Sequence, residues 1–379
     1  MLHNRQTLKA PTNLKITKIR TTRLYDESSA PFQDSTMPRA VNGLAWMFVE
    51  LETNAGITGI AYSEGAGPVR AFIHEQLSDL VVGADPFETE KIWNDLFWRV
   101  RGNGRKGAAF QAISAIDNAI WDIKAKALKV PLYRLLGPAH ERVPVYGSGG
   151  WTNYTAEELI REQRAFAEQG FTRTKMKVGK NFGRAEDEDI RRLAAVRKAL
   201  GDEATIYIDA NNGYYAKQAI RLAELFKESN VGWFEEPVLA DDIPGLAQVA
   251  ANTTIPVATG EHEYTKYGFR DLITAGAVDI VQADIGRVGG VTEWMKISHI
   301  AAAFNLPVAP HAYCLLHLHP AMATPNLMVV EMLGIEWDPM VKWLVDPPMP
   351  DAGYWKPDSD RPGNGIELNP HAVSKYRLD

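Results

Sequence analysis

The sequence predicts an α/β protein built around a (β/α)8 barrel, and two observations favour this fold class. From about residue 143 to about residue 332, eight short apolar runs alternate with amphipathic helical segments, which is the pattern of a closed parallel barrel. No G-x-G-x-x-G motif follows the first of these runs. A doubly wound dinucleotide-binding sheet is therefore the less favoured alternative.

The first third of the chain has a different pattern and predicts an α+β region. Residues 14–62 contain two stretches of alternating polarity, and the second carries a turn signal at Asn54-Ala55-Gly56. The polar stretch at 26–43 predicts a long loop, of the kind that often covers a functional site. Residues 68–136 have helical periodicity, which is clearest over AAFQAISAIDNAIWDIKAKAL.

The barrel elements follow in order. The eight predicted strands are VPVYGSGG, FTRTKMKVG, ATIYIDANNG, VGWFEEP, IPVATGEHE, AVDIVQADIG, LPVAPHAY and LMVVEM. Between the first two, TAEELIREQRAFAEQG predicts a helix that begins with a capping box of Thr155 and Glu158 and ends before Gly170.

Composition excludes several classes of protein. A net charge of -6 over 379 residues argues against a general nucleic-acid binder, and no stretch approaches the roughly 20 apolar residues that span a membrane. The N-terminal segment lacks an apolar stretch and predicts no signal peptide. Cys314 is the one cysteine, so no intrachain disulfide can form and a cytoplasmic location is expected.

An ionisable residue stands at the end of each of seven successive predicted strands, about one β/α unit apart. These residues are Lys177, Asp209, Glu235, Glu261, Asp284, His311 and Glu331. Barrel enzymes carry their chemistry at the carboxyl ends of the strands, and central barrel strands have no solvated face. We therefore expect these side chains to converge in the barrel mouth.

The stretch TKMKVG predicts where the lysines point. Strand side chains alternate, so Lys175 and Lys177 share one face, and we expect this face to be the barrel interior. Met176 and Val178 would then pack against the outer helices. Mutual repulsion is expected to lower the pKa of at least one lysine and to make it a base near neutral pH.

Three of the predicted strand ends carry carboxylates that cannot sit together without compensation, namely Asp209, Glu235 and Glu261. Protonation, the two lysines or a divalent cation could compensate them, and the oxygen ligands favour Mg²⁺. Asp284 and His311 lie on adjacent predicted strands, where a carboxylate would fix the tautomer of the imidazole.

As a set, these motifs resemble the enolase superfamily, and in particular its mandelate racemase-like subgroup. The resemblance covers nearly the whole chain and rests on KMK at 175–177, DAN at 209–211, FEEP at 234–237, TGE at 259–261, DIGRVGG at 284–290, PH at 310–311 and VVE at 329–331. The muconate-lactonizing and epimerase subgroups carry a lysine where this chain has Asp284, so they are disfavoured.

The resemblance implies an α+β capping domain at 1–135, a modified (β/α)8 TIM barrel at 140–335 and a C-terminal segment at 336–379 that returns to the capping domain. It also implies a homo-oligomer, a small sugar-acid substrate, and Mg²⁺ held by Asp209, Glu235 and Glu261.

The resemblance further implies roles for the other side chains. Lys177 would be one acid–base group, and His311, held by Asp284, would be the other on the opposite face of the substrate. Lys175 would tune Lys177 or touch the substrate carboxylate, and Glu331 would hydrogen-bond the enolate oxygen.

Several other side chains are candidates for contact with a substrate or an ion. The substrate-binding candidates are Asn211, Trp151, Arg39, His262 and Arg287. Alternation predicts that His262 points outward unless its strand bulges, and Arg287 would pair with a carboxylate or support its loop. His317 and His319 are expected in a loop, where packing or contact with substrate hydroxyls is a more frequent role for such histidines than zinc binding. The cations in RVRGNGRKG form either an anion site or a solvated turn.

The predicted reaction is abstraction of the proton α to a carboxylate, followed by β-elimination of water to give a 2-keto-3-deoxy sugar acid. The alternatives with the same lysine and histidine are a cycloisomerase of an anhydro- or lactone sugar acid and a racemase or epimerase of a 2-hydroxy acid. A Schiff-base aldolase would not need the carboxylate cluster, and a catalytically inactive relative would be expected to lack an acid–base group.

Overall fold

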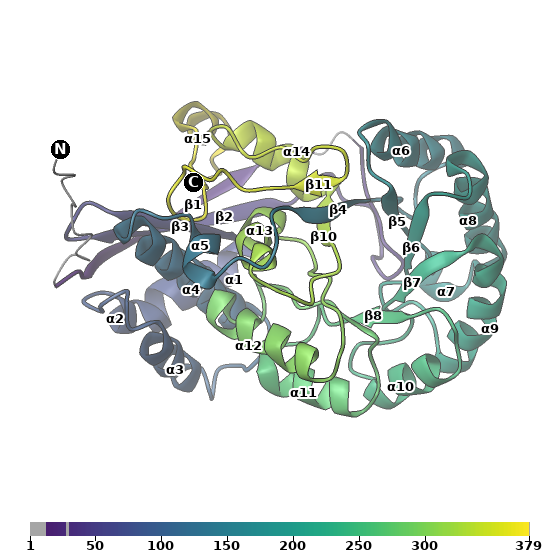
Figure 1. Ribbon diagram of the computed structural model, residues 1–379, viewed down its shortest axis with the longest axis horizontal. Coiled ribbons are helices and arrows are strands. Elements are labelled where there is room, and N and C mark those ends of the chain that lie inside the picture. The colour runs from purple at the N-terminus through teal and green to yellow at the C-terminus, as the bar shows by residue number, and fades with distance from the viewer. Residues whose placement is uncertain (1–12, 28–29, 379) are drawn as a thin grey trace, which may run out of the picture.

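The computed structural model describes residues 13–27 and 30–378. Much of the N-terminal segment, for which the sequence predicts no signal peptide, lies outside these ranges. Figure 1 shows a three-stranded sheet with helices at one end of the molecule and a barrel ringed by helices at the other. Within the described ranges, no helix is long and apolar enough to cross a membrane.

The N-terminal part is an antiparallel sheet with helices packed on it. Its strands are β1 (Ile16–Tyr25), β2 (Ala45–Thr53) and β3 (Thr58–Ser63), paired in that order. The turn between β2 and β3 lies at the predicted Asn54-Ala55-Gly56, and Gly56 has a φ of 73°, which glycine adopts without steric cost. The helices are α1 (Ala66–Ala71), the π-helix η1 (Phe72–Leu77), α2 (Ser78–Val81), α3 (Thr89–Arg99), α4 (Ala108–Ala127) and α5 (Leu132–Leu136).

The parallel barrel confirms the predicted fold class. Its strands are β4 (Val143–Ser148), β5 (Arg173–Lys177), β6 (Thr205–Asp209), β7 (Val231–Glu235), β8 (Val257–Thr259), β9 (Ile280–Val281) and β10 (Val330–Leu333). Their order is β10-β4-β5-β6-β7-β8-β9. The strand predicted at LPVAPHAY is reduced to Val308, which bridges Val281 and Leu327 and takes the seventh place in the ring.

Helices surround the barrel and follow its strands. They are α6 (Ala156–Glu168), α7 (Lys180–Gly183), α8 (Glu186–Leu200), α9 (Ala216–Phe226), the 3-10 helix η2 (Lys227–Ser229), α10 (Ile243–Ala251), α11 (Thr265–Thr274), α12 (Gly290–Ala303), α13 (Cys314–Met322) and α14 (Gly334–Trp343). The predicted capping box at the start of α6 is present, since Thr155 and Glu158 each bond the backbone N–H of the other.

The C-terminal tail lies against the N-terminal sheet. It contains β11 (Tyr354–Trp355), which pairs with β4, and α15 (Pro370–Tyr376). The backbone N–H of Leu378 donates to the carbonyl of Arg23 in β1 at 3.0 Å. A C-terminal segment that returns to the N-terminal domain would make a contact of this kind. The domain limits expected from the sequence, 1–135, 140–335 and 336–379, stay a prediction.

The loop between β1 and β2 reaches the carboxyl end of the barrel. The hydroxyl of Thr152, after β4, donates to the carbonyl of Gln33 at 2.8 Å. Ser35 donates to the carbonyl of Asn211, after β6, at 3.1 Å. Gln33 and Ser35 therefore bring this loop to the barrel mouth, where the sequence predicts a covering loop.

The interior of the barrel is filled below its mouth by a separate apolar cluster. The rings of Tyr207 and Trp233 are stacked, and Tyr146 packs edge-on against both. Ile208 and Phe234, the alternate residues of the same strands, belong instead to the large core outside the barrel. The inward face of each strand is thereby fixed, because strand side chains alternate.

Candidate active site

The strand register places the two lysines inside the barrel. Lys175 pairs in register with Tyr207, and Lys177 pairs with Asp209. Since Tyr207 points into the barrel, the lysines share its face, and both are buried. Met176 belongs to the outer core, as predicted.

The ionisable residues do not all end strands in the way the sequence suggests. Lys177, Asp209 and Glu235 are the last residues of β5, β6 and β7. Glu261 and Asp284 lie beyond the ends of β8 and β9, which are only three and two residues long. The segments after these short strands therefore carry Glu261 and Asp284 to the mouth, whereas Glu331 is the second residue of β10 and not its end.

Three buried carboxylates meet at the mouth, from Asp209, Glu235 and Glu261. One oxygen of each lies within 4.8 Å of the others, so the set could hold a metal ion. The second oxygen of Glu235 accepts hydrogen bonds from Trp233 at 2.9 Å and Gln282 at 2.8 Å. Burial, followed by repulsion from Asp209, raises the pKa of Glu235 to about 8.

The lysines neutralise part of this negative charge. Lys175 contacts Glu235 at 2.5 Å and Glu331 at 2.9 Å, and Lys177 is paired with Asp209. Burial lowers the pKa of each lysine, but the surrounding carboxylates raise it by more than burial lowers it. The pKa of both lysines is therefore raised overall. The prediction that repulsion between the two lysines lowers the pKa of one of them is wrong when only the protein's own charges are present. The carboxylates around the lysines outnumber them, and their attraction exceeds the repulsion.

His311 stands at the other end of the carboxylate set. Its Nδ1 lies 2.8 Å from Asp284 and its Nε2 lies 3.3 Å from Glu261. Burial lowers the pKa of His311, but Glu261 and the hydrogen bond to Asp284 raise it to about 10. Lys177 beside Asp209 and His311 beside Glu261 therefore flank the set from two ends, and His311 is held as a cation.

Glu331 links the lysines to the loop that carries His311. One of its oxygens contacts Lys175, and the other accepts the backbone N–H of Ala312 at 2.7 Å. Burial raises the pKa of Glu331, but Lys175 and His311 lower it to about 2. An ionised carboxylate donates no hydrogen bond. The expected bond from Glu331 to an enolate oxygen thus stays a prediction that requires a proton on Glu331.

Arg287 is engaged by carboxylates. It contacts Glu64 at 2.7 Å, Asp284 at 3.3 Å and Glu261 at 3.5 Å. Of the two roles predicted for Arg287, pairing with a carboxylate or support of its loop, the contacts show the first. Arg287 thereby ties Glu64, just after β3 of the N-terminal sheet, to two groups of the barrel site.

His262 does not follow the predicted alternation. β8 ends at Thr259, and Gly260 has a φ of 139°, so the chain turns before His262. Its Nδ1 lies 2.7 Å from Glu236 and 3.7 Å from Glu261. His262, Glu236 and Glu261 form a second group that could hold a metal ion. His262 therefore faces the carboxylates, contrary to the outward direction predicted.

The remaining substrate-binding candidates lie in different surroundings. Trp151 is buried, and its ring centroid lies 5.3 Å from the Nζ of Lys177. Asn211 is buried, and its side-chain oxygen has no hydrogen-bond partner among the described residues. Arg39 is exposed on the covering loop. Trp151 and Asn211 thus border the carboxylate and lysine groups, whereas no contact places Arg39 there.

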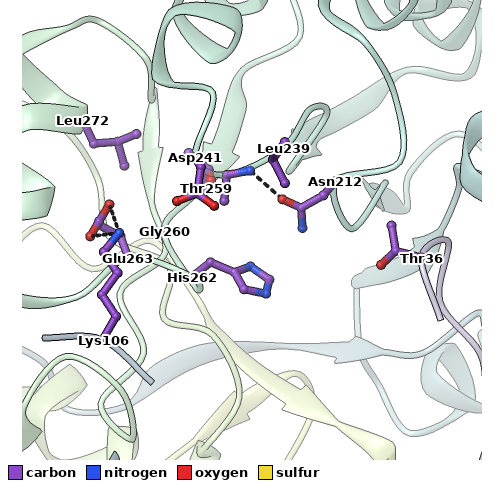
Figure 2. A pocket seen from close by; sticks show the side chains of 11 residues that line it. Thr36, Lys106, Asn212, Leu239, Asp241, Thr259, Gly260, His262, Glu263 and Leu272 are labelled. Atoms are coloured by element: carbon purple, nitrogen blue, oxygen red, sulfur yellow. Dashed lines mark hydrogen bonds and ion pairs between the residues drawn. The ribbon is translucent and has the colours of Figure 1, made fainter. Parts of the chain in front are cut away.

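A cavity of about 340 Å³ opens beside His262. Figure 2 shows His262 between Asn212 and the ion pair of Lys106 with Glu263, and Thr36 of the covering loop faces the same space. Of the cations in RVRGNGRKG, Lys106 lines this cavity.

The histidines of CLLHLH lie in helix α13, not in the predicted loop. His317 accepts the backbone N–H of Ile285 at 3.0 Å, and His319 accepts that of Tyr133 at 3.2 Å. Burial lowers the pKa of both side chains. They are neutral packing residues, which agrees with the preference for packing over zinc.

Some residues of the site were missed from the sequence. Trp233 and Gln282 precede Glu235 and Asp284 by two positions, so alternation places them on the same inward face and could have found them. Nothing in the sequence connects Glu64 with Arg287, because they are 223 residues apart.

The carboxylate set fits a divalent cation, because its donors are oxygens that converge from three strands. Mg²⁺ at one hundred times its dissociation constant is expected to raise the free energy of unfolding by about 2.7 kcal/mol. Thermal unfolding with and without Mg²⁺ measures the effect. Asp209→Asn should abolish the Mg²⁺-dependent rise, whereas Asp202→Asn, at an exposed position, should keep it. An unchanged rise in Asp209→Asn would contradict this site.

Comparison with known proteins agrees with this geometry. Residues 18–137 match the family model "Mandelate racemase / muconate lactonizing enzyme, N-terminal domain", and residues 158–372 match "Enolase C-terminal domain-like". The L-talarate/galactarate dehydratase of Salmonella typhimurium is 37% identical over 87% of this chain and 82% of its own length. The D-galactarolactone cycloisomerase of Agrobacterium fabrum is 34% identical over 96% of this chain and 99% of its own length.

A solved structure extends the likeness to three dimensions. The L-talarate/galactarate dehydratase from Salmonella typhimurium LT2, liganded with Mg and L-lyxarohydroxamate, superposes with a TM-score of 0.88 at 32% identity. The match covers 97% of this chain and 94% of that one.

Proposed function

Since the chain belongs to the enolase superfamily, in the mandelate racemase/muconate lactonizing subgroup, we propose that it is a Mg²⁺-dependent sugar-acid dehydratase. The observation that carries this proposal is the placement of Lys177 and His311 at two ends of one buried carboxylate set. A base and an acid in this arrangement can act on neighbouring carbons of one bound substrate.

Asp209, Glu235 and Glu261 would hold the cation. Bound there, Mg²⁺ supplies positive charge that stabilises the enediolate formed when a carboxylate substrate loses its α proton. The protein's part is to hold one oxygen of each ligand within 4.8 Å of the others in a buried site. Gln282 and Trp233 orient Glu235 by hydrogen bonds to one of its oxygens, and its other oxygen contacts Lys175.

Lys177 is the proposed base: positive charge held by the ligand set would lower its pKa, and the neutral amine would accept the α proton at Nζ. Its paired carboxylate, Asp209, is also a proposed ligand, so filling the ligand set would release Lys177 from the ion pair. Trp151 lies over Lys177 and covers it from solvent. Lys175 holds Glu235 and Glu331 in place.

His311 is the proposed acid and gives a proton from Nε2 to the departing β-hydroxyl. Its contact with Asp284 at Nδ1 favours the imidazolium form, which carries that proton. Asp284 holds the Nδ1 side, as in other carboxylate–imidazole pairs. Loss of water leaves an enol, which becomes the 2-keto-3-deoxy acid.

A cycloisomerase is the second candidate, because the galactarolactone enzyme matches almost the whole chain. Lys177 and His311 would then open the ring of the substrate by breaking the bond between the β carbon and the ring oxygen, with no net loss of water. A racemase or epimerase would need no leaving group.

A screen of sugar acids with Mg²⁺ in D₂O tests the proposal. We expect at least one acid to give a 2-keto-3-deoxy product, detected with semicarbazide, together with deuterium at the α carbon of unreacted substrate. Exchange without a keto product would favour racemisation, and a keto product from a lactone alone would favour cycloisomerisation. If no acid gave either deuterium exchange or a keto product, the proposal would be overturned.

A further inference from the structure

The turn that follows His311 has a strained backbone. Ala312 and Tyr313 come directly after the histidine, and each has a φ of 43°, in the left-handed region that residues other than glycine rarely adopt. Two such residues in succession cost free energy, and they persist only where the surrounding structure holds them. Helix α13 begins at Cys314, so this turn sets how the imidazole is placed relative to the rest of the fold.

Two buried carboxylates hold this turn by its backbone. Glu331 accepts the N–H of Ala312 at 2.7 Å, and Glu336, in α14, accepts the N–H of Cys314 through Oε1 at 3.0 Å. Glu331 belongs to the proposed active site. Glu336 bonds neither of the proposed proton-transfer side chains among the described residues, so its bonded link to the chemistry runs through the turn.

Tyr62, in β3 of the N-terminal sheet, fixes Glu336 in its place. The hydroxyl of Tyr62 donates to the same Oε1 at 2.7 Å. The ring of Tyr62 is stacked on that of Tyr313, with 5.5 Å between the centroids. The hydroxyl of Tyr313 in turn accepts the N–H of Glu64 at 3.0 Å. The N-terminal sheet therefore supports the turn both through Glu336 and through the ring of Tyr313.

The other oxygen of Glu336 contributes nothing to stability. Its Oε2 is buried and has no hydrogen-bond partner among the described residues, and such an oxygen costs free energy that an apolar side chain would not cost. Burial raises the pKa of Glu336 to about 7, and a proton on Oε2 would leave Oε1 able to accept both of its bonds. The hold on the turn therefore requires the acceptor oxygen and not the negative charge.

We propose that Glu336 is a positioning residue that directs His311 toward the leaving group of the substrate, by holding the strained turn at Cys314. Tyr62 takes part by holding Glu336. This inference rests on the proposed function, in which His311 is the acid, and it adds a side chain that touches no reacting atom. Lys177 lies in β5, outside this turn, so removal of the α proton does not depend on Glu336.

Glu336→Leu tests the proposal, because leucine has a similar size and accepts no hydrogen bond. We expect product formation to fall about 10- to 100-fold, since a small misplacement of a reacting group has an effect of this order. Exchange of the α proton for deuterium, which uses Lys177, should fall by much less. The ratio of exchange to elimination, measured with a sugar acid that the wild-type protein converts, should therefore rise.

Two further variants separate positioning from loss of charge and from loss of stability. In Glu336→Gln the amide oxygen can accept the same two bonds while the charge is lost, so the ratio should stay close to that of the wild type. Glu293 is also buried in a barrel helix and accepts the backbone N–H of Lys266 at 2.9 Å. The matched control Glu293→Leu should lower the melting temperature and leave the ratio unchanged.

A second readout needs no substrate. Hydrogen exchange of the backbone amides, followed by mass spectrometry of a peptide that contains residues 312–314, reports on the turn itself. The amides should lose protection in Glu336→Leu, because the N–H of Cys314 then has no acceptor, and should keep it in Glu336→Gln. If Glu336→Leu does not fold, Tyr62→Phe replaces it in both measurements, since it removes only the hydroxyl that holds Glu336.

The outcomes separate this inference from the proposed function. A wild-type ratio or wild-type protection in folded Glu336→Leu would overturn the inference, as would an equal fall of exchange and elimination. Where Tyr62→Phe has to replace it, an unchanged ratio in Tyr62→Phe would do the same. If the wild-type protein gave neither product nor α-deuterium exchange with any sugar acid, the dehydratase would be overturned, while amide protection would still show whether Glu336 holds the turn.

Discussion

Lys177→Met is expected to lower kcat by about 10²–10⁴-fold, the usual contribution of a positioned base. Among the described residues, the lost Nζ is the one nitrogen that lies both against Asp209 as its nearest carboxylate and under the ring of Trp151. Methionine has a similar length and fills the same buried space, so the barrel interior stays packed. Deuterium exchange at the α carbon should fall together with product formation, because both need removal of the same proton.

Two measurements separate this effect from damage to the fold. The Mg²⁺-dependent rise in melting temperature should persist in Lys177→Met, since none of the three proposed ligands is changed. Lys227→Met is the matched control, because Lys227 is exposed and pairs only with Glu224. α-Deuterium exchange at the wild-type rate in Lys177→Met would show that another group is the base.

His311→Asn is expected to lower product formation by about 10²–10⁴-fold while α-deuterium exchange continues. The variant removes the cation that would protonate the leaving hydroxyl and leaves Lys177 in place. Asp284 keeps a partner, because Arg287 lies 3.3 Å from it, so no buried charge is left alone. The ratio of exchange to elimination, measured by NMR and by the keto-acid assay, should therefore rise.

The reverse assignment gives the opposite result. If His311 were the base and Lys177 the acid, exchange would be lost in His311→Asn and kept in Lys177→Met. Exposed His371, in α15, supplies the control His371→Asn, which should change neither rate. The pair of variants thus assigns each proton transfer to one side chain.

The sequence predicts best where strands are regular. Alternation along TKMKVG puts Lys175 and Lys177 on one face, and the register with Tyr207 and Asp209 places that face in the barrel. The capping box of α6 and the turn at Gly56 depend on neighbouring residues only, so they too are predictable.

Prediction fails where the chain leaves its regular period or where distant segments meet. β8 ends at Thr259, and the turn at Gly260 reverses the expected direction of His262. The contact of Arg287 with Glu64 joins two separate parts of the fold. The direction of the lysine pKa shifts depends on how many carboxylates surround each Nζ, which only the assembled barrel reveals.

The loop from the N-terminal sheet holds the barrel mouth through backbone carbonyls. The backbone N–H of Thr152 donates to the carbonyl of Gln33 at 2.8 Å, and the backbone N–H of Phe182 donates to the carbonyl of Ser35 at 3.0 Å. Main-chain acceptors persist whatever side chain they carry, so the covering segment can change much of its sequence without being displaced from the rim. The covering loop can therefore change in sequence while Lys177 and His311 stay the same. New substrate ranges can evolve in this way without a change in the residues that transfer protons.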